Sequence, residues 1–245
     1  AYEHALDRLL GGTPDPAAPL EAEGQKLVEQ DRAEAFLPGA GVAILRHAES
    51  YAIAEDGLVR YTFYDLRRVS GTTDVESGAQ TQGPQIEGRI APRLLRRRIH
   101  KRDGRVLEPD AAAHASQGHS DLSQLEQGDY VEHIADGFAL PGDSGQLVID
   151  TPDLLPERTS VREATIEVRR AASIPLQVWS HALLGAPEER TEGGDKVSVW
   201  RIREAAPRRI EDGVPRRERG VGVSVGTQTW ANVARSIEEN ILSFN

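Results

Sequence analysis

The chain has 245 residues, of which 38% are hydrophobic and 28% are charged, and this length suits one large β domain or two small domains. Its formal net charge of −10 argues against a general binder of nucleic acid, because phosphate binding needs clustered lysine and arginine. The chain contains no cysteine, which excludes disulfide bonds and thiolate chemistry, and no apolar stretch approaches the roughly 20 residues of a membrane-spanning helix.

The first forty residues are predicted to form a helical hairpin. An apolar stripe with helical spacing runs through residues 1–10 and ends at Gly11-Gly12. A second helix is expected from Ala17 to Leu37, which is rich in Ala, Glu, Gln and Leu and is followed by Pro38-Gly39. Two interpretations remain open, because one hairpin shows no repeat period: residues 1–40 either end an upstream helical repeat or cap the following domain.

From Gly41 the sequence changes to the two-residue period of strands. Val42 to Ala54 and Leu58 to Val69 are rich in aliphatic and aromatic residues, and they flank Glu55-Asp56-Gly57, which is typical of a β-hairpin turn. The polar stretch from Ser70 to Gly88 is interpreted as a long loop.

A second hairpin is expected where Arg89 to His100 leads into Asp103-Gly104. Further strands are predicted at Tyr130 to Ile134, Gly145 to Ile149, Val161 to Val168, Leu176 to Leu184, Glu188 to Glu192, Lys196 to Arg203 and Val221 to Val225. Many short strands joined by turns favour a large antiparallel β-sandwich of two sheets over residues 41–226, and not a βαβ fold. Residues 227–245 return to helical spacing and are predicted to form a C-terminal helix.

Four segments in chain order carry a family resemblance. They are an Asp-Gly hairpin followed by proline, an L-x-x-G-D-x-x-E segment, a tryptophan strand before a proline-bracketed acidic stretch, and an exit strand with a tryptophan that opens the last helix. Their distinguishing residues are Asp103, Gly104, Pro109, Gly128, Asp129, Glu132, Trp200 and Trp230. In this order they resemble the bacterial domain of unknown function that precedes transglutaminase-like cores.

The resemblance implies a β-sandwich with a transglutaminase-like domain downstream in the same chain or in a partner chain. It also implies an exported or envelope protein, and therefore a periplasmic or extracellular location. It supplies no activity for this region, because the neighbouring core is the part that uses Cys, His and Asp. This chain contains no cysteine, so no catalytic residue, cofactor site or metal ligand is assigned from the family.

Histidines suggest one candidate metal site. His114, His119 and Asp121 fall within eight residues, with His100 and His133 in flanking strands. Such groups can bind zinc when the fold brings them together, but their spacing matches no compact ligand motif. The surrounding Ala, Ser, Gln and Gly favour a flexible loop.

Three carboxylates, Glu126, Asp129 and Glu132, lie near each other in the sequence, and Glu126 is the candidate acid or base among them. A structural interpretation is favoured. In it, Gly128-Asp129 makes a turn, Asp129 bonds the backbone two residues on, and Glu132 pairs with an arginine on the neighbouring strand.

Serine, tryptophan and arginine residues offer further candidates. Ser180-His181 and His119-Ser120 are adjacent pairs whose side chains would point to opposite faces of a strand, so neither forms a catalytic pair. Trp179 and Trp200 are expected to be core anchors, whereas exposure of either beside Tyr61 or Tyr64 would favour a carbohydrate or peptide groove. The basic residues Arg93 and Arg96 to Arg98 are expected to pair with nearby acids at a solvated strand end rather than to bind an anionic partner.

The sequence therefore favours a non-catalytic binding or positioning module. Such a module would support a transglutaminase-like domain, or capture peptide or glycan through its loops and sheet edges. Two alternatives stay open: a glycan-active hydrolase with paired carboxylates, and a structural spacer.

Overall fold

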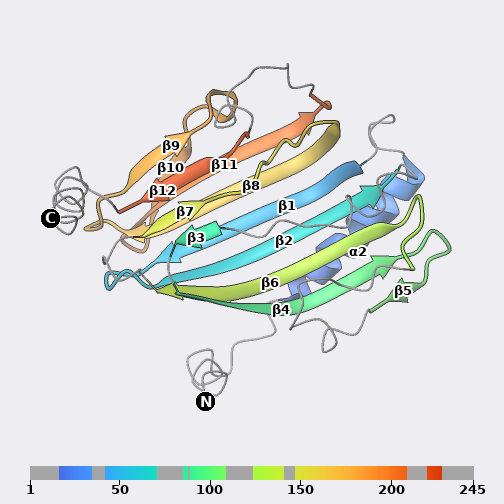
Figure 1. Ribbon diagram of the computed structural model, residues 1–245, viewed down its shortest axis with the longest axis horizontal. Helices are drawn as coiled ribbons and strands as arrows, with labels where there is room; N and C mark the ends of the chain where they lie inside the picture. Colours follow the sequence, from blue (N-terminus) through green and yellow to red (C-terminus); the bar gives the residue numbers. More distant parts are fainter. Residues whose placement is uncertain are drawn as a thin grey trace, which may run out of the picture.

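The computed structural model of the protein describes residues 17–34, 42–70, 85–87, 89–108, 124–140, 147–208 and 220–227. Over these residues the chain is mainly β, with twelve strands in two sheets, one α-helix and one 3-10 turn. Figure 1 shows the smaller sheet in front of one half of the larger sheet, and the helix α2 behind the larger sheet.

The larger sheet has eight strands in the order β10-β11-β8-β1-β2-β6-β4-β5. Their bounds are β1 Val42–Ile53, β2 Val59–Val69, β4 Arg89–His100, β5 Val106–Leu107, β6 Tyr130–Leu140, β8 Thr159–Ala171, β10 Glu188–Glu192 and β11 Asp195–Ala205. All neighbouring pairs are antiparallel except β1 and β8, which run parallel. The expectation of a fully antiparallel sheet is therefore wrong at this pair. The chain passes through β7 of the smaller sheet between β6 and β8, and this long connection allows β8 to enter alongside β1 in the same direction.

The smaller sheet has four strands in the order β3-β7-β12-β9. Their bounds are β3 Gln85–Glu87, β7 Val148–Asp150, β9 Gln177–Ser180 and β12 Val223–Gly226. Its three strand pairings are antiparallel, and they place segments that are far apart in the sequence side by side. The strands β3 and β9 form the two edges of this sheet.

The predicted tight turns are confirmed. β1 and β2 flank Glu55-Asp56-Gly57, and Gly57 takes a φ of 81° that favours glycine. β4 and β5 flank Asp103-Gly104, where Gly104 has a φ of 94°. A further glycine turn, Gly193-Gly194, joins β10 and β11, and both glycines have a positive φ.

Three expected elements differ from the structure. The strand predicted from Tyr130 to Ile134 continues to Leu140 as β6. The predicted loop from Ser70 to Gly88 contains the short strand β3, because Ile86 pairs with the buried Ile149 of β7. Where a strand was predicted from Leu176 to Leu184, the structure has the shorter strand β9, which ends at Ser180, followed by a 3-10 turn over Ala182–Leu184. Of the expected helices, α2 spans Ala17–Ala33, whereas the helices predicted over residues 1–10 and 227–245 lie outside the described residues.

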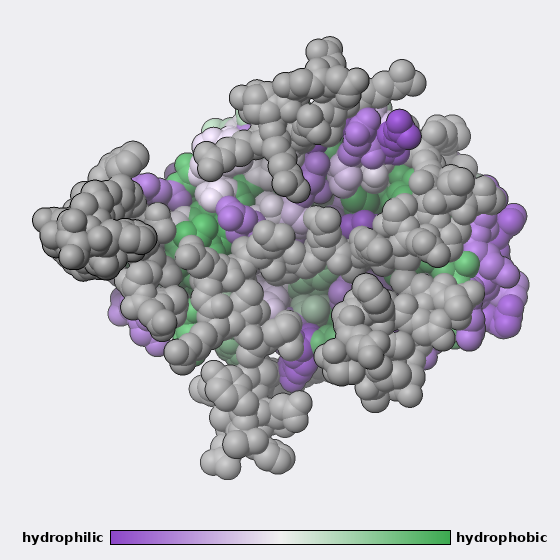
Figure 2. All heavy atoms as spheres, in the orientation of Figure 1, coloured by the Kyte–Doolittle hydropathy of each residue, from purple (hydrophilic) through white to green (hydrophobic). Residues whose placement is uncertain are grey.

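The main hydrophobic cluster joins the two sheets. It combines Tyr51, Ile166 and Trp200 of the larger sheet with Ile149 and Val225 of the smaller sheet. Burial of this apolar surface is the dominant favourable term that holds the sheets together. Figure 2 views the molecule from the side of the smaller sheet and shows hydrophilic residues gathered at the right-hand edge, the end at which β5 lies in Figure 1.

Helix α2 packs on the other face of the larger sheet. Val28 joins a second buried cluster with Leu45, Tyr64 and Ile134. Gly24 faces Glu132 and Tyr64, and a Cβ added there would overlap with the Glu132 carboxylate and lie 2.5 Å from the Tyr64 hydroxyl. The helix therefore approaches the sheet closely because this position lacks a side chain. None of the described helices has the length and apolar character needed to cross a membrane.

Candidate functional site

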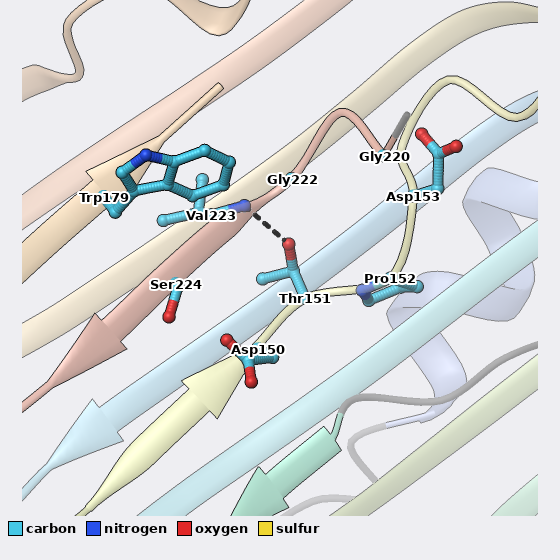
Figure 3. Close-up of a pocket in the computed structure, with 9 residues that line it drawn as sticks. All are labelled: Asp150, Thr151, Pro152, Asp153, Trp179, Gly220, Gly222, Val223 and Ser224. Carbon is cyan, nitrogen blue, oxygen red and sulfur yellow. Dashed lines mark hydrogen bonds between the residues drawn. The ribbon is translucent and has the colours of Figure 1, made fainter. Parts of the chain in front are cut away.

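A small surface pocket of about 110 Å³ lies on the smaller sheet. Figure 3 shows the nine residues that line it, which are Asp150, Thr151, Pro152, Asp153, Trp179, Gly220, Gly222, Val223 and Ser224. They come from the end of β7 and the loop after it, from the edge strand β9, and from β12 with the residues that precede it.

The sheet register brings three of these side chains onto one face. Ser224 of β12 lies directly opposite Asp150 of β7 on one side and Trp179 of β9 on the other. Opposite residues in antiparallel strands project to the same face. The next row along, Ile149 and Val225, is buried in the main core, so the row with Trp179 is the outer one. Trp179 is 54% exposed there.

Hydrogen bonds fix the loop after β7. The Thr151 hydroxyl accepts a bond from the Val223 amide at 2.8 Å. The Asp153 carboxylate accepts bonds from the amides of Val221 (2.9 Å) and Leu155 (3.0 Å). It also pairs with Arg208, with Nη2 2.9 Å from Oδ2. Asp153 is therefore occupied in holding the loop.

The Asp150 carboxylate is in a different situation. It is exposed, and within the described part of the chain it makes no hydrogen bond or ion pair. No lysine, arginine or histidine is among the nine residues that line the pocket. Gly222 keeps the pocket floor open, because a Cβ there would lie 2.9 Å from Thr151 Oγ1 and 3.3 Å from two backbone oxygens. The pocket therefore carries an uncompensated negative charge beside an exposed indole.

The edge strand β9 adjoins the pocket. Within the described residues it pairs with β12 alone. Val178 is 46% exposed, and Leu183 in the following 3-10 turn is 67% exposed. The ring of His181 meets Trp179 edge-on, with centroids 6.5 Å apart, and its Nδ1 accepts a bond from the Leu183 amide. Exposed apolar side chains at an unpaired sheet edge mark an interaction surface.

A buried ionic cluster on the larger sheet is the second candidate. His47 places Nδ1 2.8 Å from Asp65 Oδ2 and Nε2 3.1 Å from Glu49 Oε1, and the Tyr51 hydroxyl donates to Glu49 at 2.6 Å. Burial lowers the pKa of His47, but the bonds to Asp65 and Glu49 outweigh it and raise the pKa to about 9. Both ring nitrogens are occupied and the group is buried, so the cluster serves structure rather than acid–base catalysis.

The carboxylates of the L-x-x-G-D-x-x-E segment are structural. Gly128 takes a φ of 89°, which confirms the turn. The expectation that Asp129 bonds the backbone two residues on is wrong, because its carboxylate accepts the amides of Glu126 (2.9 Å) and Arg102 (3.2 Å). Lys101 Nζ reaches the same carboxylate at 2.6 Å, and this buried ammonium explains the different geometry.

Glu132 pairs with a cross-strand arginine as predicted. Its Oε2 lies 2.6 Å from Arg98 Nη2 and 3.0 Å from His100 Nε2, and its Oε1 accepts a bond from Tyr64. Glu126, in contrast, is exposed beside Lys101. Glu132 thus has partners distinct from those of Glu126 and Asp129, and the three carboxylates do not share one set of contacts.

The structure separates the two candidate tryptophans. Trp200 is 1% exposed and is confirmed as a core anchor. The same expectation is wrong for Trp179, because its strand lies at the edge of the smaller sheet and its side chain points outward. Tyr61 and Tyr64 are both buried, so no aromatic groove forms beside them.

The remaining candidates have ordinary partners or lie outside the described residues. Ser180 donates to the Gly185 carbonyl, so it does not pair with His181. Three of the four basic residues pair with acids as expected: Arg93 with Asp136, Arg96 with Glu21, and Arg98 with Glu132. The expectation is wrong for Arg97, which makes no ion pair within the described part of the chain and whose buried Nε has no hydrogen-bond partner there. No cluster of potential metal ligands occurs among the residues that the structure places. Outside them lie Pro109, His114, His119, Ser120, Asp121 and Trp230.

Sequence reasoning missed the pocket residues Asp150, Thr151 and Ser224. The turn-forming run Thr151-Pro152-Asp153 was the available signal. The residues beside Asp150 on the sheet come from distant strands, because Trp179 and Ser224 lie 29 and 74 positions further along the chain.

No protein-family model matches the sequence, and no curated protein is significantly similar to it. Among solved structures, the chain is similar to one named a "putative protease" from Parabacteroides distasonis ATCC 8503, with a TM-score of 0.61 and 16% identity over 77% of this chain. It is also matched to an M1 zinc metallopeptidase from Deinococcus radiodurans, with a TM-score of 0.34 and 12% identity over 80% of this chain. The chain spans 40% and 45% of these two structures. The first likeness shows a shared β fold.

Proposed function

We propose that the chain is a non-catalytic binding and positioning module that captures an extended peptide by strand addition at β9. The observation that carries this proposal is the exposed pair Val178 and Trp179 on a strand that ends the smaller sheet. Strand addition gives affinity through backbone hydrogen bonds and specificity through alternate side chains. In this proposal the two packed sheets form a β-sandwich, and the peptide binds at the open edge of the smaller sheet.

The backbone register of β9 supports strand addition. The amide of His181 bonds the Gly222 carbonyl, so His181 and Gly222 form a hydrogen-bonded pair. Because such pairs alternate along antiparallel strands, Trp179 also bonds toward β12. The backbone groups of Val178 and Ser180 then point away from β12, where a peptide strand can reach them.

Other edges of the described sheets are less suited to pairing. β10, at one edge of the larger sheet, has the sequence Glu-Glu-Arg-Thr-Glu, and charged side chains on an edge discourage added strands. Within β10, Arg190 and Glu192 form an ion pair with each other. β5, at the opposite edge, has two residues. The apolar exposure of β9 stands out against these protected edges.

A role beside a larger enzyme fits the comparisons. The similar structure from Parabacteroides distasonis is named a "putative protease", and this chain corresponds to 40% of it. We propose that the module positions a peptide for a neighbouring transglutaminase-like or peptidase domain, in the same chain or in a partner. With such partners, the location that we propose is the periplasm or the outside of the cell, as the family resemblance implies.

The test uses labelled synthetic octapeptides of alternating Thr and Val, with and without one arginine, and measures binding by fluorescence anisotropy. Val178→Pro removes one outward amide without touching the bonds to β12, since proline is tolerated on edge strands. Val178→Ala keeps that amide and serves as the matched control. We expect Val178→Pro to weaken binding about tenfold, and Val178→Ala to weaken it much less. Equal affinities for both variants and the original chain would refute strand addition.

A further inference from the structure

We propose that the pocket on the smaller sheet binds the cationic head group of a lysine or arginine side chain, with Trp179 as its platform and Asp150 as its counter-charge. The inference deepens the proposed function, and it rests on that function in taking the cation to belong to the captured peptide. It assigns a specificity that the edge of β9 alone would lack.

The geometry places the two recognition groups on one surface. Trp179 and Asp150 flank Ser224 on consecutive strands of the outer face, so their backbones are about 10 Å apart, two strand spacings. Figure 3 shows the indole of Trp179 reaching toward Val223 of β12, and Asp150 lying on the other side of Ser224. A head group above β12 can therefore contact both the ring and the carboxylate.

The charge balance selects a cation. Of the two carboxylates in the pocket, Asp153 is paired with Arg208, whereas Asp150 makes no pair within the described residues. None of the residues lining the pocket is basic, so an anion would meet repulsion without compensation. An ammonium or guanidinium group gains both the attraction of the carboxylate and a cation–π contact with the indole face.

The size of the pocket limits the ligand to a head group. Its volume of about 110 Å³ is well below the roughly 300–1,000 Å³ of pockets for drug-sized ligands. One guanidinium or ammonium group with its last methylene fits this space. A sugar chain would extend beyond it.

The experiment compares two octapeptides of the same backbone, one with arginine and one with citrulline, its neutral isostere. Binding to the full chain is measured by titration calorimetry, for the original protein and for the variants Asp150→Asn and Trp179→Leu. Glu108→Gln is the matched control, because Glu108 is also an exposed carboxylate but follows β5 at the far end of the larger sheet. Nα-acetyl-arginine amide serves as a probe that has no strand to add.

We expect Asp150→Asn to weaken the arginine peptide about tenfold and Trp179→Leu about fivefold, with changes below about twofold for Glu108→Gln. The citrulline peptide should bind the original chain more weakly and should not respond to Asp150→Asn. Nα-acetyl-arginine amide should bind with the same dependence on Asp150.

The possible failures are distinguishable. Equal binding of the arginine and citrulline peptides, both weakened by Val178→Pro, would overturn the cation pocket and leave strand addition standing. Binding of Nα-acetyl-arginine amide that depends on Asp150, without any effect of Val178→Pro on the peptides, would support the pocket and refute strand addition. Triacetylchitotriose bound in its place, and lost in Asp150→Asn, would make the pocket a glycan site and overturn the inference.

Discussion

The Nδ1 atom of His47 lies 2.8 Å from Oδ2 of Asp65, and the two residues face each other directly across β1 and β2. Asp65 in turn faces His133 across β2 and β6. The Phe63 ring meets both imidazoles edge-on, at 5.4 Å in each case. Two histidines thus flank one carboxylate, and their environments push their pKa values in opposite directions.

The first prediction concerns stability above neutral pH. The pKa of His47 is raised to about 9 in the folded chain, since the bonds to Asp65 and Glu49 outweigh burial, which lowers it. The ordinary pKa of histidine, which applies to the unfolded chain, is about 6.5. Protonated His47 therefore contributes its full stabilisation of the fold below about pH 6.5, and this stabilisation is lost as pH rises through 9. We expect the free energy of unfolding to fall by on the order of 2 kcal/mol across this window. Urea titrations at several pH values check this.

His47→Gln is the informative variant for that window, because glutamine does not titrate. It should be less stable at pH 6.5 and nearly independent of pH from 6.5 to 9. The absence of cysteine removes another group that would titrate in this range. A variant that keeps the full slope of the original chain would show that His47 is not the responsible group.

The second prediction concerns mild acid. Burial, followed by the charge of Arg97, lowers the pKa of His133 to about 4. In the unfolded chain this imidazole is protonated below about pH 6.5, whereas in the folded chain it is protonated only below about pH 4. The free energy of unfolding therefore falls as pH drops from 6.5 to 4. We expect His133→Gln to flatten the acid limb of the stability profile. An unchanged acid limb in thermal melts from pH 6.5 to 4 would contradict this.

The third prediction concerns the docking of α2. Gly24→Ala would place a methyl group against Glu132 and Tyr64. Alanine favours an isolated helix by about 1 kcal/mol, yet we expect a net loss of about 1–3 kcal/mol in the free energy of unfolding because of overpacking. Lys26→Ala, at an exposed position of the same helix, is the control and should change stability little. Stabilisation by Gly24→Ala would show that the helix can shift away from the sheet.

The fourth prediction concerns the Gly-Asp turn. Asp129→Ala would leave the buried Lys101 ammonium and two backbone amides without their shared acceptor. Removing one partner of a buried ion pair costs about 3–5 kcal/mol, and we expect a loss of that order in urea unfolding. Glu126→Gln removes the other, 76% exposed carboxylate beside Lys101 and should change the free energy of unfolding little, because solvent screens this pair. Equal losses would mean that Asp129 is no more important than a surface acid.

Local features of the fold were predictable because their cause lies in neighbouring residues. The turns at Glu55-Asp56-Gly57 and at Asp103-Gly104 need a positive φ, which glycine supplies, so the hairpins around them could be located without long-range information. That Glu132 would pair with an arginine on the neighbouring strand was also foreseeable, whereas the register of β4 and β6 decides that this arginine is Arg98.

The candidate site could not be predicted in the same way. Trp179 lies in an apolar strand that is indistinguishable by its alternation from that of the buried Trp200. What separates them is the place of β9 at the end of the smaller sheet. The cluster around His47 was missed because polar residues within an otherwise apolar strand show no motif until the register sets them opposite their partners.

The sequence by itself determined the mainly β class and the tight turns between strands, because alternation and turn chemistry act over a few residues. Tertiary structure alone decided the parallel pairing of β1 with β8, the exposed edge at β9 and the position of Asp150 opposite Ser224. These features depend on which strands pair with one another across long connections. The free energy that favours one set of pairings comes from burial of the whole core and not from any local stretch of sequence.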